Sequence, residues 1–267
     1  MRTLRIVTLN IWNRGGPWEA RLAEIRRELA QLDPDVVGLQ EVLRPRGTEV
    51  PDQAAQIAEG LGYHIAYGAS FDGGGYEFGN AALSKFPVAR TEVFPLPQLD
   101  SPESRCLLFA ELDAPFGKIP FFVTHLAWRF SEGYVREAQV KMIAERVKAL
   151  APIEGFPPIL VGDFNAAPEC DEIRYLKGQC SLGTRSVYFA DAFGLAGHGD
   201  GTTFTSRNPF ASDLREPDRR IDYVFVRGPD QRGRGEPLDA RVCFDRPKNG
   251  VFASDHFGVG ATIRAEP

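Results

Sequence analysis

An aspartate and an asparagine follow a short apolar segment in the middle of the 267-residue chain. Residues 158–165 read PILVGDFN, so a proline and a glycine bracket apolar residues, and Asp163 and Asn165 come next. This pattern predicts a short buried strand. Because alternate side chains of a strand share a face, Asp163 and Asn165 are expected to point into one pocket. There the carboxylate can accept a proton from an attacking water, and the amide can orient that water.

Polar residues also stand at the ends of other predicted strands. Together with the first pair they form a set of eight: Asn10, Glu41, His125, Asp163, Asn165, Asp222, Asp255 and His256. Magnesium takes oxygen ligands, commonly one or two carboxylates with water and substrate phosphate, and Glu41 and Asp255, with Asn10, fit that role. A carboxylate behind a histidine holds the imidazole in one tautomer and stabilises its charged form. Asp222 can do this for His256.

Several members of the set also have a purely structural interpretation. The aspartate–asparagine pair can form an Asx turn ahead of Pro168. Asp222 can form a salt bridge with Arg219 or Arg220, and His125 alone is typical of a buried core histidine. The occurrence of all eight at strand ends favours the functional interpretation.

The elements that must position these residues are predicted from hydrophobic periodicity and from prolines and glycines. Apolar residues at steps of three and four predict a helix from Trp18 to Leu32. Further helical segments are expected at 52–61, 140–150 and 166–177. Strands are expected at 4–11, 36–39, 63–67, 80–84, 88–94, 105–112, 119–126, 202–204, 221–226 and 238–244, with a last strand opening at 254. Many strands with few helices between them favour a sandwich of mixed sheets.

Seven short segments resemble, in order, the motifs of the endonuclease/exonuclease/phosphatase superfamily. These metal-dependent phosphoesterases include pancreatic deoxyribonuclease, abasic-site endonucleases, neutral sphingomyelinases and inositol polyphosphate phosphatases. The segments are TLNIW (8–12), LQEV (39–42), GNAALS (79–84), THL (124–126), GDFN (162–165), RIDY (220–223) and SDH (254–256). The resemblance therefore covers nearly the whole chain.

The resemblance implies an α/β fold, a four-layer α/β sandwich with two mixed β-sheets packed face to face and helices outside. It implies that water attacks phosphorus in line, assisted by Mg²⁺, with Mn²⁺ as an alternative ion. Glu41, Asn10 and Asp255 would hold the metal. The catalytic residues would be His125, Asp163, Asn165, Asp222 and His256.

Substrate contacts are expected from loops, because the scaffold carries only the phosphate chemistry. Three loops should rim the site, at 72–78, 128–133 and 206–219. The substrate-binding candidates are Arg105, at a position where relatives often contact phosphate, Arg207 and Asn208 in the third loop, and Asn80, which is equally interpretable as structural. The glycine-rich stretch 70–79 is predicted to be a mobile loop, since it lacks the lysine and the following helix of a phosphate-binding loop.

Composition sets further bounds. The chain carries a formal net charge of −5 and a pI near 5.5, which does not favour nucleic acid as a partner. No linker divides it, so residues 1–267 are expected to form one catalytic domain. No apolar leader and no run of 18 apolar residues is present, which predicts a cytoplasmic protein without a transmembrane segment. No obligate protein partner is indicated.

Three functions remain open at this point. The leading one is a metal-dependent phosphoesterase whose phosphate-ester substrate is a small phosphorylated metabolite or a lipid head group. The enzymatic alternative is a DNA or RNA endonuclease or exonuclease. The alternative of another class is a non-catalytic binding module on the same fold, which is disfavoured because none of the eight positions is missing.

Overall fold

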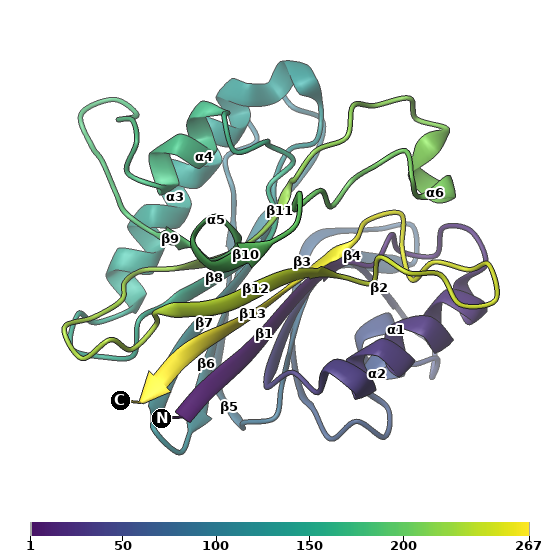
Figure 1. Ribbon diagram of the computed structural model, residues 1–267. Helices are drawn as coiled ribbons and strands as arrows, with labels where there is room; N and C mark the ends of the chain where they lie inside the picture. Colours follow the sequence, from purple (N-terminus) through teal and green to yellow (C-terminus); the bar gives the residue numbers. More distant parts are fainter. Residues whose placement is uncertain (1, 267) are drawn as a thin grey trace.

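Two β-sheets lie face to face between two layers of helices in the computed structural model, which describes residues 2–266 (Figure 1). Within those residues, the larger sheet has seven strands, in the spatial order β10 (Gly197–His198), β12 (Pro237–Cys243), β13 (Gly258–Glu266), β1 (Arg2–Asn10), β2 (Val36–Pro45), β4 (Tyr76–Ser84) and β3 (His64–Gly73). The smaller sheet has six, in the order β5 (Val88–Pro95), β6 (Cys106–Ala114), β7 (Gly117–His125), β8 (Ile159–Asp163), β11 (Asp222–Val226) and β9 (Ala190–Asp191).

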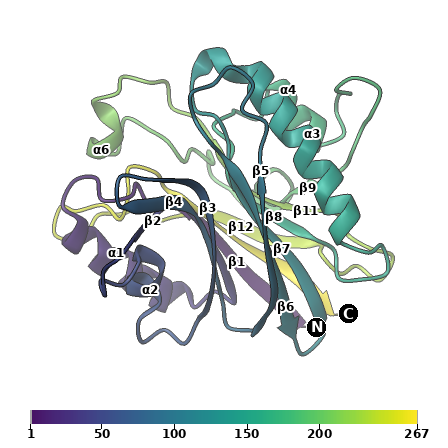
Figure 2. The same ribbon diagram turned by 180° about the vertical axis from the view of Figure 1, so that it is seen from behind.

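Both sheets are mixed. Strands β1 and β2 are parallel in the larger sheet, and β7 and β8 are parallel in the smaller one, whereas most other neighbours are antiparallel. Helices α1 (Trp18–Leu32) and α2 (Gln53–Ala58) cover the larger sheet, while α3 (Gly133–Leu150) and α4 (Asp171–Leu176) cover the smaller (Figure 2). The remaining helices are short: a 3₁₀ turn at Phe130–Glu132, α5 (Ala192–Ala196) and α6 (Pro209–Ser212). The expected four-layer α/β sandwich is confirmed.

The core has three apolar layers because each sheet buries both faces. On β1, Leu4 and Ile6 point between the sheets, and Val7 and Leu9 point towards Ile25 of helix α1. A third cluster joins the smaller sheet to α3 and α4. Burial on both faces explains why the strands read as nearly continuous apolar runs rather than as clean alternation.

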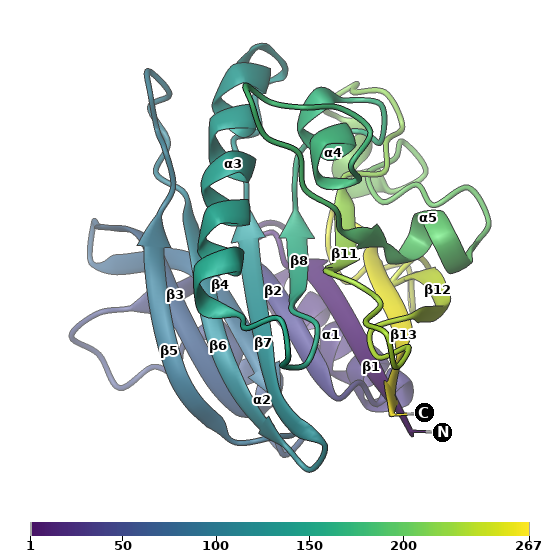
Figure 3. The ribbon, with the colours of Figure 1, turned by 90° about the vertical axis from the view of Figure 1, so that its left-hand side faces the viewer.

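The polar residues continue the inter-sheet faces of the strands beyond the core. On β7, Phe121 and Val123 lie between the sheets, and His125 is the next residue on that face. On β8, Val161 is followed in the same way by Asp163. Strands β7 and β8 are parallel and end at the same edge of the sheet (Figure 3). Because His125 is paired to Asp163, the two residues lie side by side at this edge.

Gly162 permits the close approach of these two strands. Its φ is +152°, and a Cβ atom at this position would lie 2.0 Å from the carbonyl oxygen of Thr124. Any side chain here would push β8 away from β7. The glycine of the GDFN segment therefore places Asp163 beside His125.

The stretch 70–79 differs from its prediction as a mobile loop. It is a β-hairpin in which β3 pairs with β4 up to Gly73 and Tyr76. Gly74 and Gly75, with φ of +64° and +83°, form the two-residue turn. A Gly-Gly pair provides the two positive φ angles that such a turn requires, so the glycines close a hairpin here and do not indicate mobility.

Other predicted boundaries also shift. Strand β2 continues to Pro45 instead of ending at 39, and the expected strand at 202–204 is a single bridge from Phe204 to Arg219. The last strand opens at Gly258, so Asp255 and His256 lie in the loop before it. The helix expected over 166–177 is limited to α4, and the elements at 190–198 were not predicted. Among residues 2–266, no helix has the length and apolar character needed to cross a membrane.

Candidate active site

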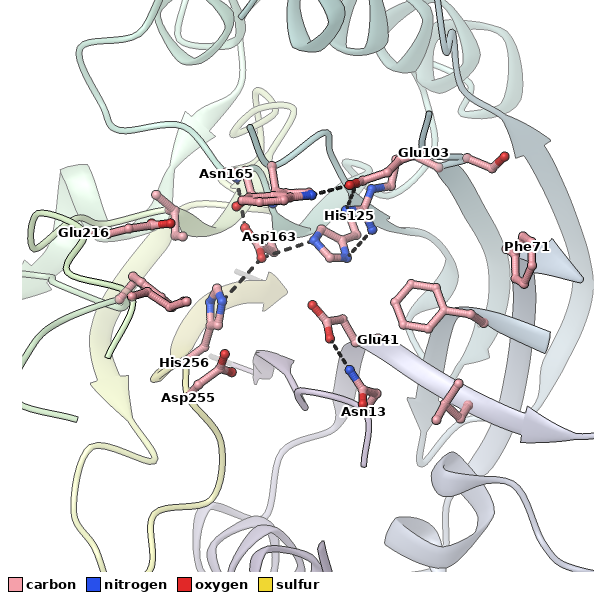
Figure 4. A pocket seen from close by; sticks show the side chains of 18 of the residues that line it. Asn13, Glu41, Phe71, Glu103, His125, Asp163, Asn165, Glu216, Asp255 and His256 are labelled. Atoms are coloured by element: carbon pink, nitrogen blue, oxygen red, sulfur yellow. Dashed lines mark hydrogen bonds and ion pairs between the residues drawn. The ribbon is translucent and has the colours of Figure 1, made fainter. Parts of the chain in front are cut away.

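A pocket of about 840 Å³ opens at the edge where these strand ends meet. Six of the eight predicted residues line it: Glu41, His125, Asp163, Asn165, Asp255 and His256 (Figure 4). The other two, Asn10 and Asp222, are buried directly behind the lining and bond to it. Residues separated by more than 240 positions in the sequence therefore meet around one cavity.

Asp163 is at the centre of the contacts. Its Oδ2 accepts a hydrogen bond from Nδ2 of Asn10 at 3.0 Å and lies 3.4 Å from Nε2 of His125 and 3.7 Å from Nε2 of His256. Its Oδ1 accepts from the backbone N–H of Asn165 at 2.9 Å, so the Asx turn is also present. Burial, reinforced by the Asp222 carboxylate, raises the pKa of Asp163 to about 7 against the opposing charge of His256. A carboxylate with this pKa can exchange a proton near neutral pH.

His256 is held as an imidazolium. Its Nδ1 donates to Oδ2 of Asp222 at 3.0 Å. Burial alone would lower the pKa of His256, but the carboxylates of Asp222, Asp163 and Asp255 raise it well above the usual value. The second oxygen of Asp222, Oδ1, is buried without a hydrogen-bond partner among the described residues. Neither Arg219 nor Arg220 pairs with Asp222, since they pair with Glu216 and Asp191.

His125 has the opposite protonation state. Nη1 of Arg105 lies 3.1 Å from its Nδ1. A guanidinium can only donate, so Nδ1 must accept and the ring proton must be on Nε2, the nitrogen that faces Asp163. Burial and the charges of Arg105 and His256 hold the pKa of His125 well below its usual value. Asp163 therefore lies between a neutral and a charged imidazole.

Glu41 reaches the pocket through an irregularity in β2. The register to β4 shifts between Leu39 and Val42, and Glu41 has a φ of +60°. A positive φ is costly for a residue with a side chain and is found mainly where the surroundings enforce it. Nδ2 of Asn10 donates to Oε1 of Glu41 at 3.1 Å, and Nδ2 of Asn13 donates to Oε2 at 2.8 Å.

Asn10 joins two carboxylates. The same Nδ2 donates to Glu41 and to Asp163, while its Oδ1 accepts from the backbone N–H of Trp12 at 3.0 Å. The bond from Trp12 fixes which end of the amide faces the pocket. In this arrangement Asn10 positions the acids through its nitrogen, whereas direct metal ligation would need its oxygen.

Asp255 lies opposite Glu41 in a loop that is fixed by buried polar groups. The Nδ2 of Asn208 donates to the carbonyl oxygens of Ser254 and Asp255, at 2.8 and 3.0 Å. The hydroxyl of Ser254 donates to the carbonyl oxygen of Asn10 at 2.6 Å. Burial, together with the nearby Glu41 carboxylate, raises the pKa of Asp255 to about 6, although His256 opposes the shift.

Two groups of donor atoms are available to a cation. Asp163, Asp222 and His256 each place a donor atom within 4.8 Å of the others, but a charged His256 has both ring nitrogens protonated and cannot bind a cation. Glu41 and Asp255 repel one another across the pocket, and the oxygen-only character of the pair suits a hard cation such as Mg²⁺. The residues present therefore fit a divalent ion, with Glu41 and Asp255 the better placed to hold it.

Of the four predicted substrate-binding residues, the structure places one in the pocket lining and three outside it. Arg105 lines the pocket. Asn80 is buried and donates to the carbonyl oxygen of Cys106 at 3.1 Å, which is a structural contact. Asn208 is also buried, where it anchors the Asp255 loop. Arg207 lies outside this pocket, half exposed and within 3.3 Å of Asp200, so the structure does not place it with the site.

One buried arginine was missed by sequence reasoning. Arg21 of α1 is fully buried and donates to five carbonyl oxygens, among them Ile11 at 2.7 Å and Ala253 at 3.1 Å. It thereby ties the loop after Asn10 to the loop before Asp255. In the sequence it is an ordinary polar residue in an amphipathic helix, and only its position nine residues after TLNIW could have drawn attention to it.

Comparison with known proteins identifies the family. The sequence profile of the Endonuclease/Exonuclease/phosphatase family matches residues 7–256, which include every site residue described above. The chain belongs to this family, as the resemblance implied. It is a hydrolase acting on phosphate ester bonds, of a family whose enzymes depend on divalent metal ions.

Individual relatives are distant. Protein angel of Drosophila melanogaster is 26% identical over 92% of this chain and 72% of its own length. Exodeoxyribonuclease III of Haemophilus influenzae is 27% identical over 73% of each chain. Protein angel homolog 2 of Homo sapiens is 28% identical, and the alignment spans 60% of this chain but 31% of that protein.

Solved structures resemble the whole chain. D. rerio TDP2 complexed with single strand DNA product has a TM-score of 0.75 at 21% identity, covering 98% of this chain and 99% of that one. The endonuclease/exonuclease/phosphatase from Beutenbergia cavernae has a TM-score of 0.73 at 27% identity, covering 99% of this chain and 72% of that one. The likeness to TDP2 establishes the fold alone.

Proposed function

We propose that this protein hydrolyses phosphodiester bonds in single-stranded nucleic acid with the help of Mg²⁺ or Mn²⁺. The observation that carries the chemistry is the convergence of Asn10, His125 and His256 on one oxygen of Asp163, beside the Glu41–Asp255 pair. This arrangement supplies a proton acceptor, charged and neutral donors, and a place for a cation within one cavity.

The choice of nucleic acid over a small metabolite rests on two further observations. A relative is an exodeoxyribonuclease, and a structural neighbour was solved with a single-stranded DNA product. The pocket is also lined by several aromatic rings, including Phe71, Trp128 and Phe204. Aromatic side chains beside a phosphate site are typical of proteins that bind single strands by stacking. The net negative charge remains compatible with a substrate held mainly through one metal-bound phosphate.

In the proposed reaction, water attacks phosphorus in line with the leaving oxygen. Asp163 accepts the proton of that water. Asn165 lines the pocket beside it: its backbone N–H donates to Oδ1 of Asp163 and its Nδ2 donates to the carbonyl oxygen of Leu126 at 3.2 Å, so its Oδ1 is the atom that would orient the nucleophile. The bond from phosphorus to the leaving oxygen breaks as the new P–O bond forms, and the leaving oxygen takes up a proton from solvent. The products of the reaction are a phosphomonoester and a free hydroxyl group.

The two histidines have different tasks. His256, charged through its contact with Asp222, stabilises the negative charge that develops on the phosphoryl oxygens and the leaving group. His125 offers a neutral N–H donor from the other side of Asp163. When bound at Glu41 and Asp255, the divalent ion would act as a Lewis acid towards the phosphoryl oxygens.

A substrate panel assayed with each metal tests the proposal. It consists of a single-stranded oligonucleotide, the same strand in a duplex, a glycerophosphodiester and a phosphomonoester, each with Mg²⁺, with Mn²⁺ or with EDTA. We expect cleavage of the single strand with either metal and none in EDTA. Turnover of the glycerophosphodiester or the monoester alone would return the assignment to a small metabolite or lipid head group.

A further inference from the structure

A row of apolar side chains crosses three strands of the larger sheet at one side of the pocket. In the strand register, Leu43 of β2 pairs with Phe78 of β4, and Phe78 pairs with Phe71 of β3. Paired residues share a face of the sheet, and all three line the pocket together with Tyr76, which lies two residues from Phe78 on the same face of β4. We call Leu43, Phe71, Tyr76 and Phe78 the hairpin wall.

The rings of the hairpin wall are unusually available to a ligand. Phe71 is 48% exposed and Tyr76 is 41% exposed. The two rings lie 6.3 Å apart at 55°, and the Phe71 ring rests over Gly73, where a Cβ atom would approach it to 2.6 Å. Large apolar groups that are held in place yet left open to solvent are typical of a binding surface.

The hairpin wall begins next to the catalytic centre. Glu41 and Leu43 alternate along β2 and both line the pocket. Figure 4 shows Phe71 beyond Glu41, on the side away from Glu216 and Asp255. A group attached directly to a phosphate at Glu41 and Asp255 would therefore meet these rings.

The charges around the hairpin wall are already paired. Arg44 lies 3.1 Å from Asp52, and Arg46 lies 2.8 Å from Asp72 and 3.0 Å from Glu77. These cations alternate with the residues of the wall and are held by their own acids. The wall thus offers apolar and aromatic surface to an uncharged ring, and no unpaired arginine to a second phosphate.

The arginines that line the pocket are also paired with acids. Its two arginines among the described lining residues, Arg105 and Arg219, are ion-paired with Glu103 and Glu216. Binding to many phosphates would require free cations along the strand path. The binding energy for the substrate must therefore come mostly from one phosphate and from the part of the substrate that contacts the aromatic rings.

We propose that the hairpin wall stacks the base of the nucleotide next to the scissile phosphate, which makes the enzyme selective for unpaired nucleotides. This inference rests on the proposed function and deepens it, because a base held inside a duplex presents no free face to Phe71 and Phe78. Base stacking on aromatic side chains tolerates any base, so selectivity for single strands comes without selectivity for sequence.

The test compares the single-stranded hexanucleotide dT6 with the same chain carrying abasic residues, for the variants Phe71→Ala, Phe78→Ala and Phe71→Trp. The matched control is Tyr188→Ala, an aromatic ring that is 55% exposed and lies outside the pocket lining. We expect Phe71→Ala and Phe78→Ala each to raise KM for dT6 about fivefold or more. Phe71→Trp should have a KM for dT6 close to that of the wild type, and Tyr188→Ala should leave this KM unchanged. For the abasic chain, KM should be the same in the wild type, Phe71→Ala and Phe78→Ala.

The outcomes separate the two proposals. If the wild-type enzyme cleaves dT6 but KM is unaffected by Phe71→Ala and Phe78→Ala, or rises equally for the abasic chain, the stacking site is refuted and the nuclease remains. If no oligonucleotide is cleaved while methyl 4-nitrophenyl phosphate is hydrolysed with Mg²⁺, the nucleic-acid function itself is refuted, and the stacking site with it. A slope of KM against salt that indicates many phosphate contacts would also contradict the inference.

Discussion

Nη1 of Arg105 lies 3.1 Å from Nδ1 of His125 and sets the proton of this imidazole on the nitrogen facing Asp163. Arg105 is itself held by Glu103, 2.7 Å from its Nη2. The arginine was predicted to contact phosphate, and its observed partner is a histidine. Burial is the larger cause of the lowered pKa of His125, and the charge of Arg105 lowers this pKa further. Together they keep the imidazole ring neutral.

Replacing this arginine should change the pH dependence of the reaction. In Arg105→Gln the cation that lowers the pKa of His125 is gone, so this pKa rises and the ring becomes protonated at a higher pH. If neutral His125 is required, the acid limb of kcat/KM against pH moves to higher pH. The control is Arg129→Gln, since Arg129 lies 3.4 Å from the same Glu103. An acid limb that is the same in all three proteins would contradict this role of Arg105.

Removing the proton acceptor should abolish most activity without unfolding the protein. For Asp163→Asn we expect kcat to fall ~10²-fold or more, the usual size of a general-base contribution. The raised pKa of Asp163 means that its ionised form is disfavoured in the folded state, so stability from this group declines as pH rises from about 4 towards 7. At pH 8 in EDTA, the melting temperature of Asp163→Asn should therefore equal or exceed that of the wild type.

The matched control for this change is Asp171→Asn, an exposed acid at the start of α4 that pairs with Arg174. Its kcat should remain within a factor of two or so of the wild type. Activity of Asp163→Asn above about a tenth of the wild-type value would remove Asp163 from the proton-transfer step.

Metal binding can be measured without turnover. A ligand at 100 times its Kd stabilises the folded state by about 2.7 kcal/mol, so saturating Mg²⁺ should raise the melting temperature of the wild type. Glu41→Gln and Asp255→Asn should each lose most of this increase. Glu216→Gln removes another acid of the same pocket, one that is paired with Arg219, and should keep the increase. Equal loss in all three variants would argue against a site at Glu41 and Asp255.

Arg21 should be a major determinant of stability. In Arg21→Met, five carbonyl oxygens lose the guanidinium donor inside the protein, and each buried acceptor left unsatisfied costs about 1–3 kcal/mol. The control is Arg26→Met on the same helix, whose surface pair with Glu59 is worth about 1 kcal/mol or less. Chemical denaturation provides both values, and similar costs for the two variants would disprove the structural role of Arg21.

Much of the fold was predictable because its elements are local. The period of apolar residues correctly predicts α1 from Trp18 to Leu32, and the apolar runs before His125 and Asp163 correctly predict β7 and β8. Where prediction failed, a long-range contact or a turn overrode the local pattern. The local sequence around Gly74 and Gly75 predicts a mobile loop, whereas the structure has a hairpin there, because strand pairing depends on the register between two strands.

In the candidate site, too, some features follow from the local sequence and others depend on long-range contacts. The types and order of its eight residues were evident from the sequence, because they stand at predicted strand ends and in short segments that resemble the family's motifs. Asn80 and Asn208 also looked available to a substrate, but both are buried against backbone carbonyls. Whether an amide faces a ligand or the protein's own backbone depends on neighbours that are remote in the chain.

The sequence by itself determined that acids, amides and histidines suited to metal-assisted phosphate chemistry would be placed at strand ends, since strand ends and side-chain types are local properties. Only the tertiary structure decided that Glu41 turns inward through a positive φ, that one histidine is charged and the other neutral, and that aromatic rings line the same pocket as Glu41 and Asp255. These features depend on which strands become neighbours, on burial and on the fields of charges far away in the chain. A local pattern contains none of that information.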